Sequence, residues 1–364
     1  MARALALAAR GLYTTTPNPR VGCVIVSDDR VVGEGWHRRA GEAHAEVAAL
    51  ADARDRGQDV RGATLYVTLE PCNSEGRTPP CVDAIIGAGI ARVVVAMHDP
   101  NPVNAAGAAR LRAAGVRVDI GLLEHEATEL NVGFVSRMQR GLPWVRSKIA
   151  ASLDGRTALA GGASRWITGE VARADGHAWR ARACAVLTGV GTVLHDDPQL
   201  TVRHVTTSRQ PLRVVVDRHA STPPDARVLE DGNALLATAG ASNPQWPAAV
   251  EVVALPDGNG RVALDALLRE LARRGANEVH VEAGAKLNGA LMRAGLIDEL
   301  VVYFAGALIG DPARGMFEFP APLASLADRV SLDWTSVERV GGDLRVVARV
   351  RRPRAAGMMA DGSG

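Results

Sequence analysis

The sequence predicts an α/β protein with two domains. It has 364 residues, and at roughly 100–200 residues per domain this length corresponds to two domains. Hydrophobic residues make up 47 % of the chain, which is enough for two packed cores. Segments typical of strands and helices alternate along both halves, without an internal repeat, and a break falls at the Gly-Leu-Pro of residues 141–143. Because this join is short, we expect the two domains to pack at a fixed angle.

The first half, residues 1–141, is predicted to contain one largely buried sheet. VGCVIV (21–26) and VVGEGWH (31–37) flank the polar turn SDDR and predict a hairpin. Further strands are predicted at 63–70, 91–97 and 116–121, and helices at 44–54, 79–89, 105–115 and 124–141. The N-terminal MARALALAARG predicts a helix ended by Gly11 rather than a signal peptide, because arginines interrupt its apolar run.

The second half, residues 144–352, repeats the alternation. Strands are predicted at 144–152, 185–190, 212–217, 233–238, 250–255, 277–284 and 298–310, and helices at 170–183, 263–275 and 285–295. Residues 353–364 are predicted to be a flexible tail. No stretch of about 18 apolar residues occurs, so no membrane span is predicted.

Charge and cysteine content narrow the functional class. The formal net charge is +2 and aromatic residues make up 4 % of the chain, which argues against nucleic acid or an acidic membrane surface as a partner. Four cysteines in a chain of this length do not form a disulfide scaffold. They are typical of a reducing compartment, and we expect a cytoplasmic protein in which clustered cysteines bind metal or act in catalysis.

A histidine, a glutamate and two cysteines predict a metal site. Zinc takes imidazole and thiolate ligands, and a catalytic zinc has three protein ligands and leaves its fourth position for water. His44, Cys72 and Cys81 meet that count, so we predict one zinc ion per chain. Glu46, close to His44 at a helix start, could move the proton of the water without being a ligand. Pro71 is expected to hold Cys72 at the opening of the next helix, where the helix dipole favours a thiolate.

Each of these residues has a simpler interpretation when taken alone. His44 could cap a helix, and the cysteines could be small packed side chains. A structural zinc would require a fourth protein ligand, but Cys23 and Cys184 lie within apolar strand patterns. The combination of H-x-E with a downstream P-C and a second cysteine is typical of zinc-dependent deaminases and favours catalysis. Its second cysteine usually stands three positions after the first, whereas here NSEGRTPP separates the two.

This wide spacing and several longer strings resemble the family of bifunctional riboflavin-biosynthesis deaminase/reductases. TPNPRVGCVIV (16–26), GEGWHRRAGEAHAEVAAL (33–50), VTLEPC (67–72), GRTPPC (76–81) and DPNP (99–102) resemble the deaminase domain. ASLDGRTA (151–158), SRWIT (164–168), TVLHDDPQLTVR (192–203) and VEAGAKLNGAL (281–291) resemble the reductase domain. The resemblance covers essentially the whole chain. It implies a cytidine-deaminase-like three-layer α/β/α domain over 1–141 and a dihydrofolate-reductase-like α/β domain over 144–352.

For the first domain, the resemblance implies hydrolytic deamination of 2,5-diamino-6-ribosylamino-4(3H)-pyrimidinone 5′-phosphate, with Glu46 as the catalytic residue. It also implies substrate contacts from Asn18 and His37, and a phosphate contact from Arg77, whose planar fork matches phosphate oxygens. Asn18 taken alone could be a turn residue before proline. The chain departs from the family at Ser74, where members often have a histidine; Glu75 follows.

For the second domain, the resemblance implies hydride transfer from NADPH that converts the ribosyl group to ribityl, giving 5-amino-6-ribitylamino-uracil 5′-phosphate. No G-x-G-x-x-G follows the first strand, so a Rossmann site is not predicted. Small residues in 187–197 and 282–290 let a backbone approach phosphate closely. The implied NADPH contacts are Ala150, Trp166, Thr192, Asp196, Gly284, Ala285, Lys286, Leu287, Asn288, Gly289 and Ala290. The implied substrate contacts are Lys148, Asp154, Ser164, Arg180, Leu200, Arg203 and Glu282.

Other interpretations stay open on the sequence. Trp166 could be a core residue, Asp196 could cap a helix or a turn, and Arg218 is the candidate contact for the 2′-phosphate that distinguishes NADPH from NADH. A nucleic-acid deaminase would share the metal motif but would require a basic, aromatic-rich surface. The C-terminal half could be a non-catalytic binding or assembly module. The partners expected from the resemblance are a small phosphorylated pyrimidine and further copies of the chain, as a dimer or tetramer.

Overall fold

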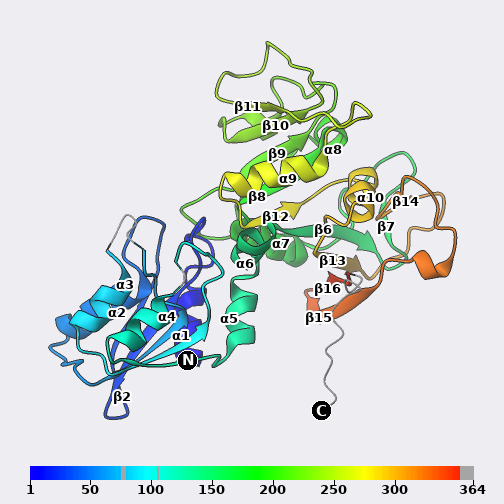
Figure 1. Ribbon diagram of the computed structural model, residues 1–364. Helices are drawn as coiled ribbons and strands as arrows, with labels where there is room; N and C mark the ends of the chain where they lie inside the picture. Colours follow the sequence, from blue (N-terminus) through cyan, green and yellow to red (C-terminus); the bar gives the residue numbers. More distant parts are fainter. Residues whose placement is uncertain (75–78, 105, 353–364) are drawn as a thin grey trace, which may run out of the picture.

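The computed structural model describes residues 1–74, 79–104 and 106–352, which form two large sheets (Figure 1). The first sheet has five strands in the order β2-β1-β3-β4-β5. These strands are β1 (Gly22–Ser27), β2 (Arg30–Trp36), β3 (Thr64–Leu69), β4 (Arg92–Met97) and β5 (Arg117–Ile120). β1 is antiparallel to β2 and β3, while β3, β4 and β5 run parallel. The predicted hairpin and strands are therefore present.

Helices cover both faces of this sheet. On one face lie α1 (Ala2–Ala9) and α5 (Glu124–Leu130), and on the other lie α2 (Ala45–Asp55), α3 (Cys81–Gly87) and α4 (Gly107–Ala113). Close approach of these layers depends on glycine. A Cβ on Gly22 would lie 2.0 Å from the Ala4 carbonyl oxygen in α1, and a Cβ on Gly35 would lie 2.5 Å from the Ala49 backbone nitrogen in α2. The N-terminal segment is the amphipathic helix that the sequence predicts.

The predicted helix over 124–141 is divided at Asn131 into α5 and α6 (Val132–Arg140). The Asn131 side chain is buried and hydrogen-bonds to both backbone groups of Arg20. Its Oδ1 accepts from the Arg20 backbone nitrogen at 2.8 Å, and its Nδ2 donates to the Arg20 carbonyl oxygen at 2.9 Å. The Asn131 backbone, at φ −112° and ψ 18°, leaves the helical region to allow this.

The second sheet has nine strands in the order β11-β10-β9-β8-β12-β6-β13-β16-β15. The parallel strands are β6 (Trp144–Ser152), β8 (Ala185–Gly189), β9 (Leu212–Val216), β10 (Ala234–Thr238), β11 (Glu251–Ala254), β12 (Glu278–Val281) and β13 (Glu299–Ala305). β15 (Leu332–Val340) and β16 (Asp343–Val350) add an antiparallel hairpin at one edge. The helices are α7 (Glu170–Arg182), α8 (Val190–Asp196), α9 (Leu264–Arg273) and α10 (Ala285–Arg293).

Some of these elements are not predicted by the sequence. β15 and β16 lie at the edge of the sheet, and β15 is mostly exposed, so its residues carry no continuous apolar pattern. β7 (Arg156–Ala158) and β14 (Arg314–Gly315) pair only with each other, across more than 150 residues of chain. Residues 190–196 form α8, a helix that is not among those predicted from the sequence.

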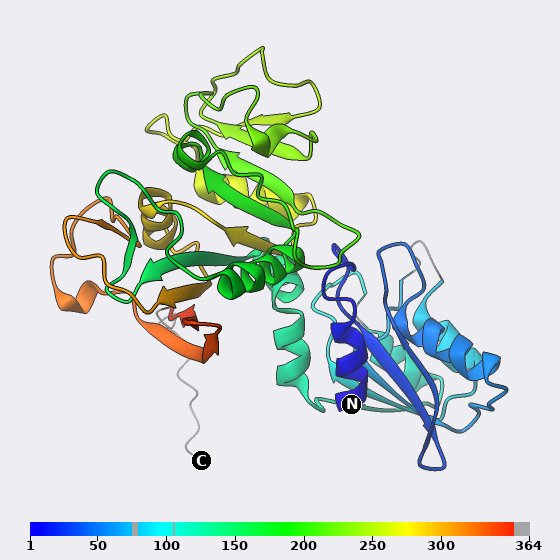
Figure 2. The ribbon, with the colours of Figure 1, turned by 180° about the vertical axis from the view of Figure 1, so that it is seen from behind.

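The helix α6 lies between the two sheets (Figures 1 and 2). Contacts around it join the first unit to the second. Thr16 Oγ1 and Cys184 Sγ are 2.9 Å apart, and Arg209 donates to the Tyr13 carbonyl oxygen at 3.2 Å. In the part of the chain that the structure describes, no helix is both long and apolar enough to span a membrane.

Candidate active sites

Three predicted metal ligands lie together in the first unit. One ligand atom each from His44, Cys72 and Cys81 lies within 4.8 Å of the others. His44 Nδ1 is 3.2 Å from Cys81 Sγ and 3.5 Å from Cys72 Sγ. His44 is the residue before α2, so that the helix fixes its backbone, and Cys81 is the first residue of α3. Cys23 and Cys184 belong elsewhere, in β1 and at the junction of the units.

The position of Cys72 corrects one expectation. Cys72 does not open a helix, because the chain between β3 and α3 is irregular on both sides of residues 75–78 and the helix begins only at Cys81. Hydrogen bonding with Cys81 nevertheless lowers the pKa of Cys72 to about 4, and His44 adds to the effect. The Cys81 backbone nitrogen also donates to Cys72 Sγ at 3.3 Å. The donors to the thiolate therefore include the first backbone nitrogen of α3, although Cys72 itself lies before the helix.

Glu46 lies in the first turn of α2 and is almost fully buried. Burial raises the pKa of its carboxyl group. A carboxyl group with a raised pKa beside a metal site is suited to accept a proton and release it again. The alternative in which His44 only caps the helix does not apply, because its side chain makes no capping hydrogen bond.

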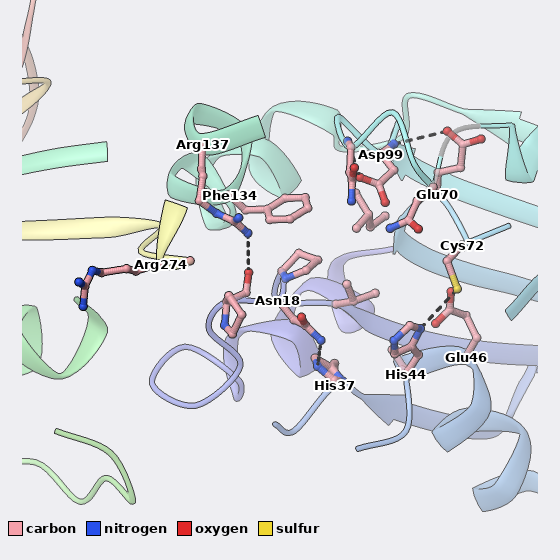
Figure 3. Close-up of a pocket in the computed structure, with 18 of the residues that line it drawn as sticks. Asn18, His37, His44, Glu46, Glu70, Cys72, Asp99, Phe134, Arg137 and Arg274 are labelled. Atoms are coloured by element: carbon pink, nitrogen blue, oxygen red, sulfur yellow. Dashed lines mark hydrogen bonds between the residues drawn. The ribbon is translucent and has the colours of Figure 1, made fainter. Parts of the chain in front are cut away.

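A cavity of about 410 Å³ opens beside this cluster (Figure 3). His44, Glu46 and Cys72 line it, together with the predicted substrate residues Asn18 and His37. Asn18 Nδ2 is 3.0 Å from His37 Nε2, and His37 Nδ1 is 3.1 Å from the Ala43 carbonyl oxygen. Burial lowers the pKa of His37, so that a neutral ring donates from Nδ1 and accepts at Nε2. Asn18 is therefore more than a turn residue.

Glu70 positions a further part of the cavity wall, which was not predicted from the sequence. Its carboxylate accepts from the Ala108 backbone nitrogen at 2.9 Å and lies 2.8 Å from His98 Nδ1. These contacts fix the chain at His98 and at Ala108, and Asp99, Asn101 and Asn104 line the cavity. The DPNP string was the available signal for this wall. Ser74 Oγ donates to Asn104 Oδ1 at 2.5 Å, while Arg77 and Glu75 lie outside the described residues.

The second unit contributes to the same cavity. Residues 273–275, at the end of α9, complete its lining together with Phe134 and Arg137 of α6, the last helix of the first unit. No local motif marks residues 273–275, because they reach the cavity only through the packing of the two units. A cavity lined from both units places the first site at their junction.

A second cavity, of about 900 Å³, lies at the carboxyl ends of the parallel strands in the second unit. Seven predicted cofactor residues line it: Ala150, Thr192, Asp196, Gly284, Ala285, Lys286 and Leu287. Lys148, Ser164 and Glu282 of the predicted substrate residues line it as well. Arg314, Gly315, Phe317 and Glu318, which no motif singled out, close one side.

The other predicted cofactor residues lie outside this lining. A Cβ on Gly289 would lie 1.9 Å from the Glu318 carbonyl oxygen, so this glycine packs α10 against the segment that closes the cavity. Asn288 is buried and donates to the Ala283 carbonyl oxygen at 3.1 Å. Trp166 is 70 % exposed, so the core interpretation is wrong for it. Ala290 and Arg218 are likewise absent from the lining.

Arg180 and Glu282 form a bidentate ion pair at the edge of the second cavity, with Arg180 Nη2 2.8 Å from a Glu282 oxygen. Burial alone would raise the pKa of Glu282, but the Arg180 guanidinium outweighs it and holds that pKa well below its usual range. Lys148 faces the same region, and burial lowers its pKa. This group of charges could bind a polyhydroxylated, phosphorylated ligand.

Three more of the predicted substrate residues, Asp154, Leu200 and Arg203, do not line the second cavity. Asp154 accepts from the backbone nitrogens of Ile309 and Gly310 at 3.1 and 2.7 Å, so its carboxylate holds a loop. Leu200 is buried. Arg203 donates to the Thr201 side chain at 3.0 Å.

Comparison with known proteins matches both units. Residues 1–97 match the cytidine and deoxycytidylate deaminase zinc-binding region, and residues 143–346 match the RibD C-terminal domain. The chain is 47 % identical over 358 residues to the riboflavin biosynthesis protein RibD of Escherichia coli, covering 94 % of this chain and 96 % of that protein. It is 40 % identical to the Aquifex aeolicus RibD, covering 94 % and 96 %.

Solved structures match over the whole length as well. An Acinetobacter baumannii RibD superposes with a TM-score of 0.89 at 42 % identity, covering 96 % of this chain and 98 % of that one. A diaminohydroxyphosphoribosylaminopyrimidine deaminase/5-amino-6-(5-phosphoribosylamino)uracil reductase of Thermotoga maritima superposes with a TM-score of 0.88 at 36 % identity, covering 96 % and 97 %. The predicted fold class is confirmed: a cytidine-deaminase-like sheet precedes a dihydrofolate-reductase-like sheet.

These matches also confirm the predicted enzyme class, a deaminase and a pyrimidine reductase of riboflavin biosynthesis. Two full-length superpositions and a His/Cys/Cys cluster inside the zinc-binding region agree on it. The chain therefore belongs to the RibD family of riboflavin-biosynthesis proteins, in which one polypeptide carries both a deaminase and a reductase.

Proposed function

We propose that the chain carries out two successive reactions on one phosphorylated pyrimidine. The first is hydrolytic deamination of 2,5-diamino-6-ribosylamino-4(3H)-pyrimidinone 5′-phosphate. The second is NADPH-dependent reduction of the ribosyl group, giving 5-amino-6-ribitylamino-uracil 5′-phosphate. We assign deamination to residues 1–141 and reduction to residues 144–352. The observation that carries the proposal is the His44, Cys72 and Cys81 cluster beside buried Glu46.

The donor set of this cluster fits zinc. Two thiols and one imidazole are ligands that zinc prefers, and three protein ligands leave a position for water. Zinc bound here would act as a Lewis acid and lower the pKa of a water molecule to about 7. Glu46 is placed to take that proton and to return it to the leaving amine, which departs as ammonia. The Asn18 and His37 pair would orient the pyrimidine ring by hydrogen bonds.

The second cavity fits a dinucleotide cofactor. A Cβ on Gly191 or Gly284 would meet no atom within 4 Å, so the backbone there is open to a closely approaching phosphate. NADPH would supply the hydride. Lys148 and the Arg180–Glu282 pair would hold the ribose and its phosphate against the cofactor.

The proposal extends to assembly and location. The hairpin of β15 and β16 lies at the edge of the second sheet and exposes Trp334, Val337 and Leu344; Trp334 is 70 % exposed. An exposed apolar edge of this kind can pair with the same edge of another copy of the chain. This supports a homo-oligomer, a dimer or tetramer. The molar mass of the purified chain in solution would test this. All four cysteines are free thiols, which fits the cytoplasm.

A coupled assay on the purified, zinc-loaded chain tests the two reactions separately. Ammonia release and NADPH consumption are followed from the phosphorylated diaminopyrimidinone, with Glu46→Gln as the variant. The wild type should give both signals. Glu46→Gln should lose ammonia release while retaining zinc, and NADPH consumption should return when the deaminated pyrimidine is supplied.

Other results would change the assignment. Ammonia release without any NADPH consumption would make the C-terminal half a non-catalytic binding or assembly module. Ammonia release by Glu46→Gln at the wild-type rate would remove Glu46 from the catalytic role. Binding to RNA that weakens as salt rises would favour a nucleic-acid deaminase.

A further inference from the structure

Segment 201–203 lies between α8 and β9, next to residues expected to contact the substrate of the second unit. Leu200 directly precedes the segment, and Arg203 ends it. The segment belongs to none of the described strands, although Val202 is buried. Backbone groups that are buried outside a sheet require hydrogen-bond partners from elsewhere. The side chains around the segment supply these partners.

Two side chains of α7 bind the ends of the segment. Arg180 Nη1 donates to the Thr201 carbonyl oxygen at 3.0 Å. The Arg203 backbone nitrogen donates to His177 Nδ1 at 3.2 Å. His177 and Arg180 are three residues apart on the helix, so their side chains leave it on the same face. The helix therefore fixes the segment at two points.

The middle of the segment is held by Gln210, shortly before β9. Its Oε1 accepts from the Val202 backbone nitrogen at 2.8 Å, and its Nε2 donates to the Val202 carbonyl oxygen at 3.1 Å. Leu200 benefits from this support, because its φ of 54° is a left-handed conformation. A bulky residue keeps such a conformation only where the surrounding contacts fix it. The four hydrogen bonds to the next three residues are contacts of this kind.

His177 is suited to accept the hydrogen bond because its ring is neutral. The residue is 6 % exposed, and the ring of His204 packs against it with the centroids 4.6 Å apart. Burial, aided by the charges of Arg180 and Arg203, lowers the pKa of His177 to about 4. A neutral imidazole can leave Nδ1 without a proton, as the contact with the Arg203 nitrogen requires.

The same face of α7 connects the segment to the second cavity. Arg180 also forms the bidentate pair with Glu282, which lines that cavity. The Arg203 side chain makes no ion pair within the described part of the chain, and its Nη1 donates to the neutral oxygens of Gln199 and Thr201. Its charge is therefore left for an anionic ligand. A shift of the Arg203 backbone would move this charge relative to the Arg180–Glu282 pair.

We propose that His177 is a positioning residue for the reductase substrate. By accepting from the Arg203 backbone nitrogen, it fixes Leu200 and Arg203 beside the Arg180–Glu282 pair. The proposal rests on the proposed function, since it presumes that Leu200 and Arg203 contact the substrate. A histidine that only fills space in the core makes a different prediction, because its volume and not its Nδ1 would then matter.

Two substitutions of His177 separate the hydrogen bond from the volume of the ring. His177→Phe keeps a ring of similar size but has no acceptor. His177→Asn loses volume but places a carbonyl oxygen close to the position of Nδ1. The hydrogen-bond role makes His177→Asn the milder variant, whereas a packing role makes His177→Phe the milder one. Gln210→Ala loosens the same segment from an exposed residue outside α7.

The experiment measures NADPH consumption by the zinc-loaded full chain with the deaminated, phosphorylated pyrimidine. His177→Phe should raise KM for the pyrimidine by about 2- to 10-fold, the loss expected for one hydrogen bond. The KM for NADPH and kcat should change little, because segment 201–203 is not part of the lining of the cofactor cavity. His177→Asn should lie close to the wild type, and Gln210→Ala should resemble His177→Phe. Ammonia release in the first unit should stay unchanged in all three variants.

Hydrogen exchange of the peptide that covers residues 199–205, followed by mass spectrometry without any ligand, gives a readout independent of turnover. The Arg203 backbone N–H loses its acceptor in His177→Phe, so this peptide should exchange faster there than in the wild type. In His177→Asn the exchange should stay close to that of the wild type.

Several results would overturn the proposal. One is a larger rise in KM for the pyrimidine in His177→Asn than in His177→Phe, and another is an equal rise in KM for the pyrimidine and for NADPH. If His177→Phe does not fold, an unchanged KM for the pyrimidine in Gln210→Ala would decide against the proposal. If the wild type consumes no NADPH with the deaminated pyrimidine, the proposed function fails; unchanged exchange of residues 199–205 in His177→Phe would then overturn the His177 proposal separately.

Discussion

Arg20 of the first unit and Glu278 of the second form a buried ion pair, with a nitrogen-to-oxygen distance of 2.8 Å. Glu278 is the first residue of β12, and Arg20 precedes β1. The same carboxylate is 2.9 Å from Arg146 and 2.6 Å from Arg182. One buried anion therefore balances cations from both units and couples their orientation.

Removal of the charge on Glu278 should strongly destabilise the protein. Glu278→Gln leaves three closely spaced guanidinium groups without their shared carboxylate, and losing one partner of a buried ion pair costs about 3–5 kcal/mol. Urea unfolding followed by tryptophan fluorescence would measure the free energy of unfolding. Glu34→Gln, whose partner Arg3 is exposed, is the control and should shift the transition little. Equal shifts in the two variants would contradict the central role of Glu278.

The stability of the wild type should fall with acid more steeply than that of Glu278→Gln. Burial opposes ionisation of Glu278, but Arg182, Arg20 and Arg146 outweigh it and hold its pKa well below the usual range. A lowered folded-state pKa gives stability that is present above the unfolded-state pKa, about 4.3, and lost as the pH falls. The difference between wild type and variant in free energy of unfolding should therefore shrink from about pH 5 toward pH 3. A constant difference across this range would contradict a folded-state pKa of Glu278 below that of the unfolded chain.

Loss of a cysteine from the cluster should remove zinc and deamination together. Cys81→Ser should lower the zinc content below one ion per chain, because a neutral hydroxyl replaces a thiolate ligand. Ammonia release should disappear, while reduction of the deaminated pyrimidine continues in the other unit. Cys23→Ala removes a thiol from β1 outside the cluster and should keep its zinc. Full zinc content in Cys81→Ser, determined by atomic absorption, would exclude Cys81 as a ligand.

Two glycines near the second cavity should respond differently to alanine. A Cβ on Gly284 meets nothing within 4 Å on the cavity side, so Gly284→Ala should fold normally but raise KM for NADPH. A Cβ on Gly289 would clash with the Glu318 backbone, and such overpacking costs about 1–3 kcal/mol or more. Thermal unfolding and a fluorescence titration with NADPH separate the two effects. Unchanged NADPH binding in Gly284→Ala would argue against the cradle at the start of α10.

Local sequence patterns predict many of the observed helices and strands. β6 begins and ends where the apolar run 144–152 predicts. It is buried in the middle of a sheet, so its apolar residues identify it as a strand without any information about distant parts of the chain. The division at Asn131 could not be predicted, since it depends on a hydrogen-bonding partner, Arg20, 111 residues away. The edge hairpin of β15 and β16 was missed because an exposed edge strand lacks the apolar pattern of a buried one.

The sequence by itself determined the fold class, the family and the metal cluster. His44, Cys72 and Cys81 stand in motifs typical of a zinc-binding deaminase region, so their residue types and spacing identify the cluster without the structure. Only the tertiary structure decided what faces these residues. Residues 273–275 reach the first cavity through the docking of the two units, and Glu70 acts through backbone groups that follow β4. Such contacts join residues far apart in the chain, and their energies depend on burial and geometry that no local pattern encodes.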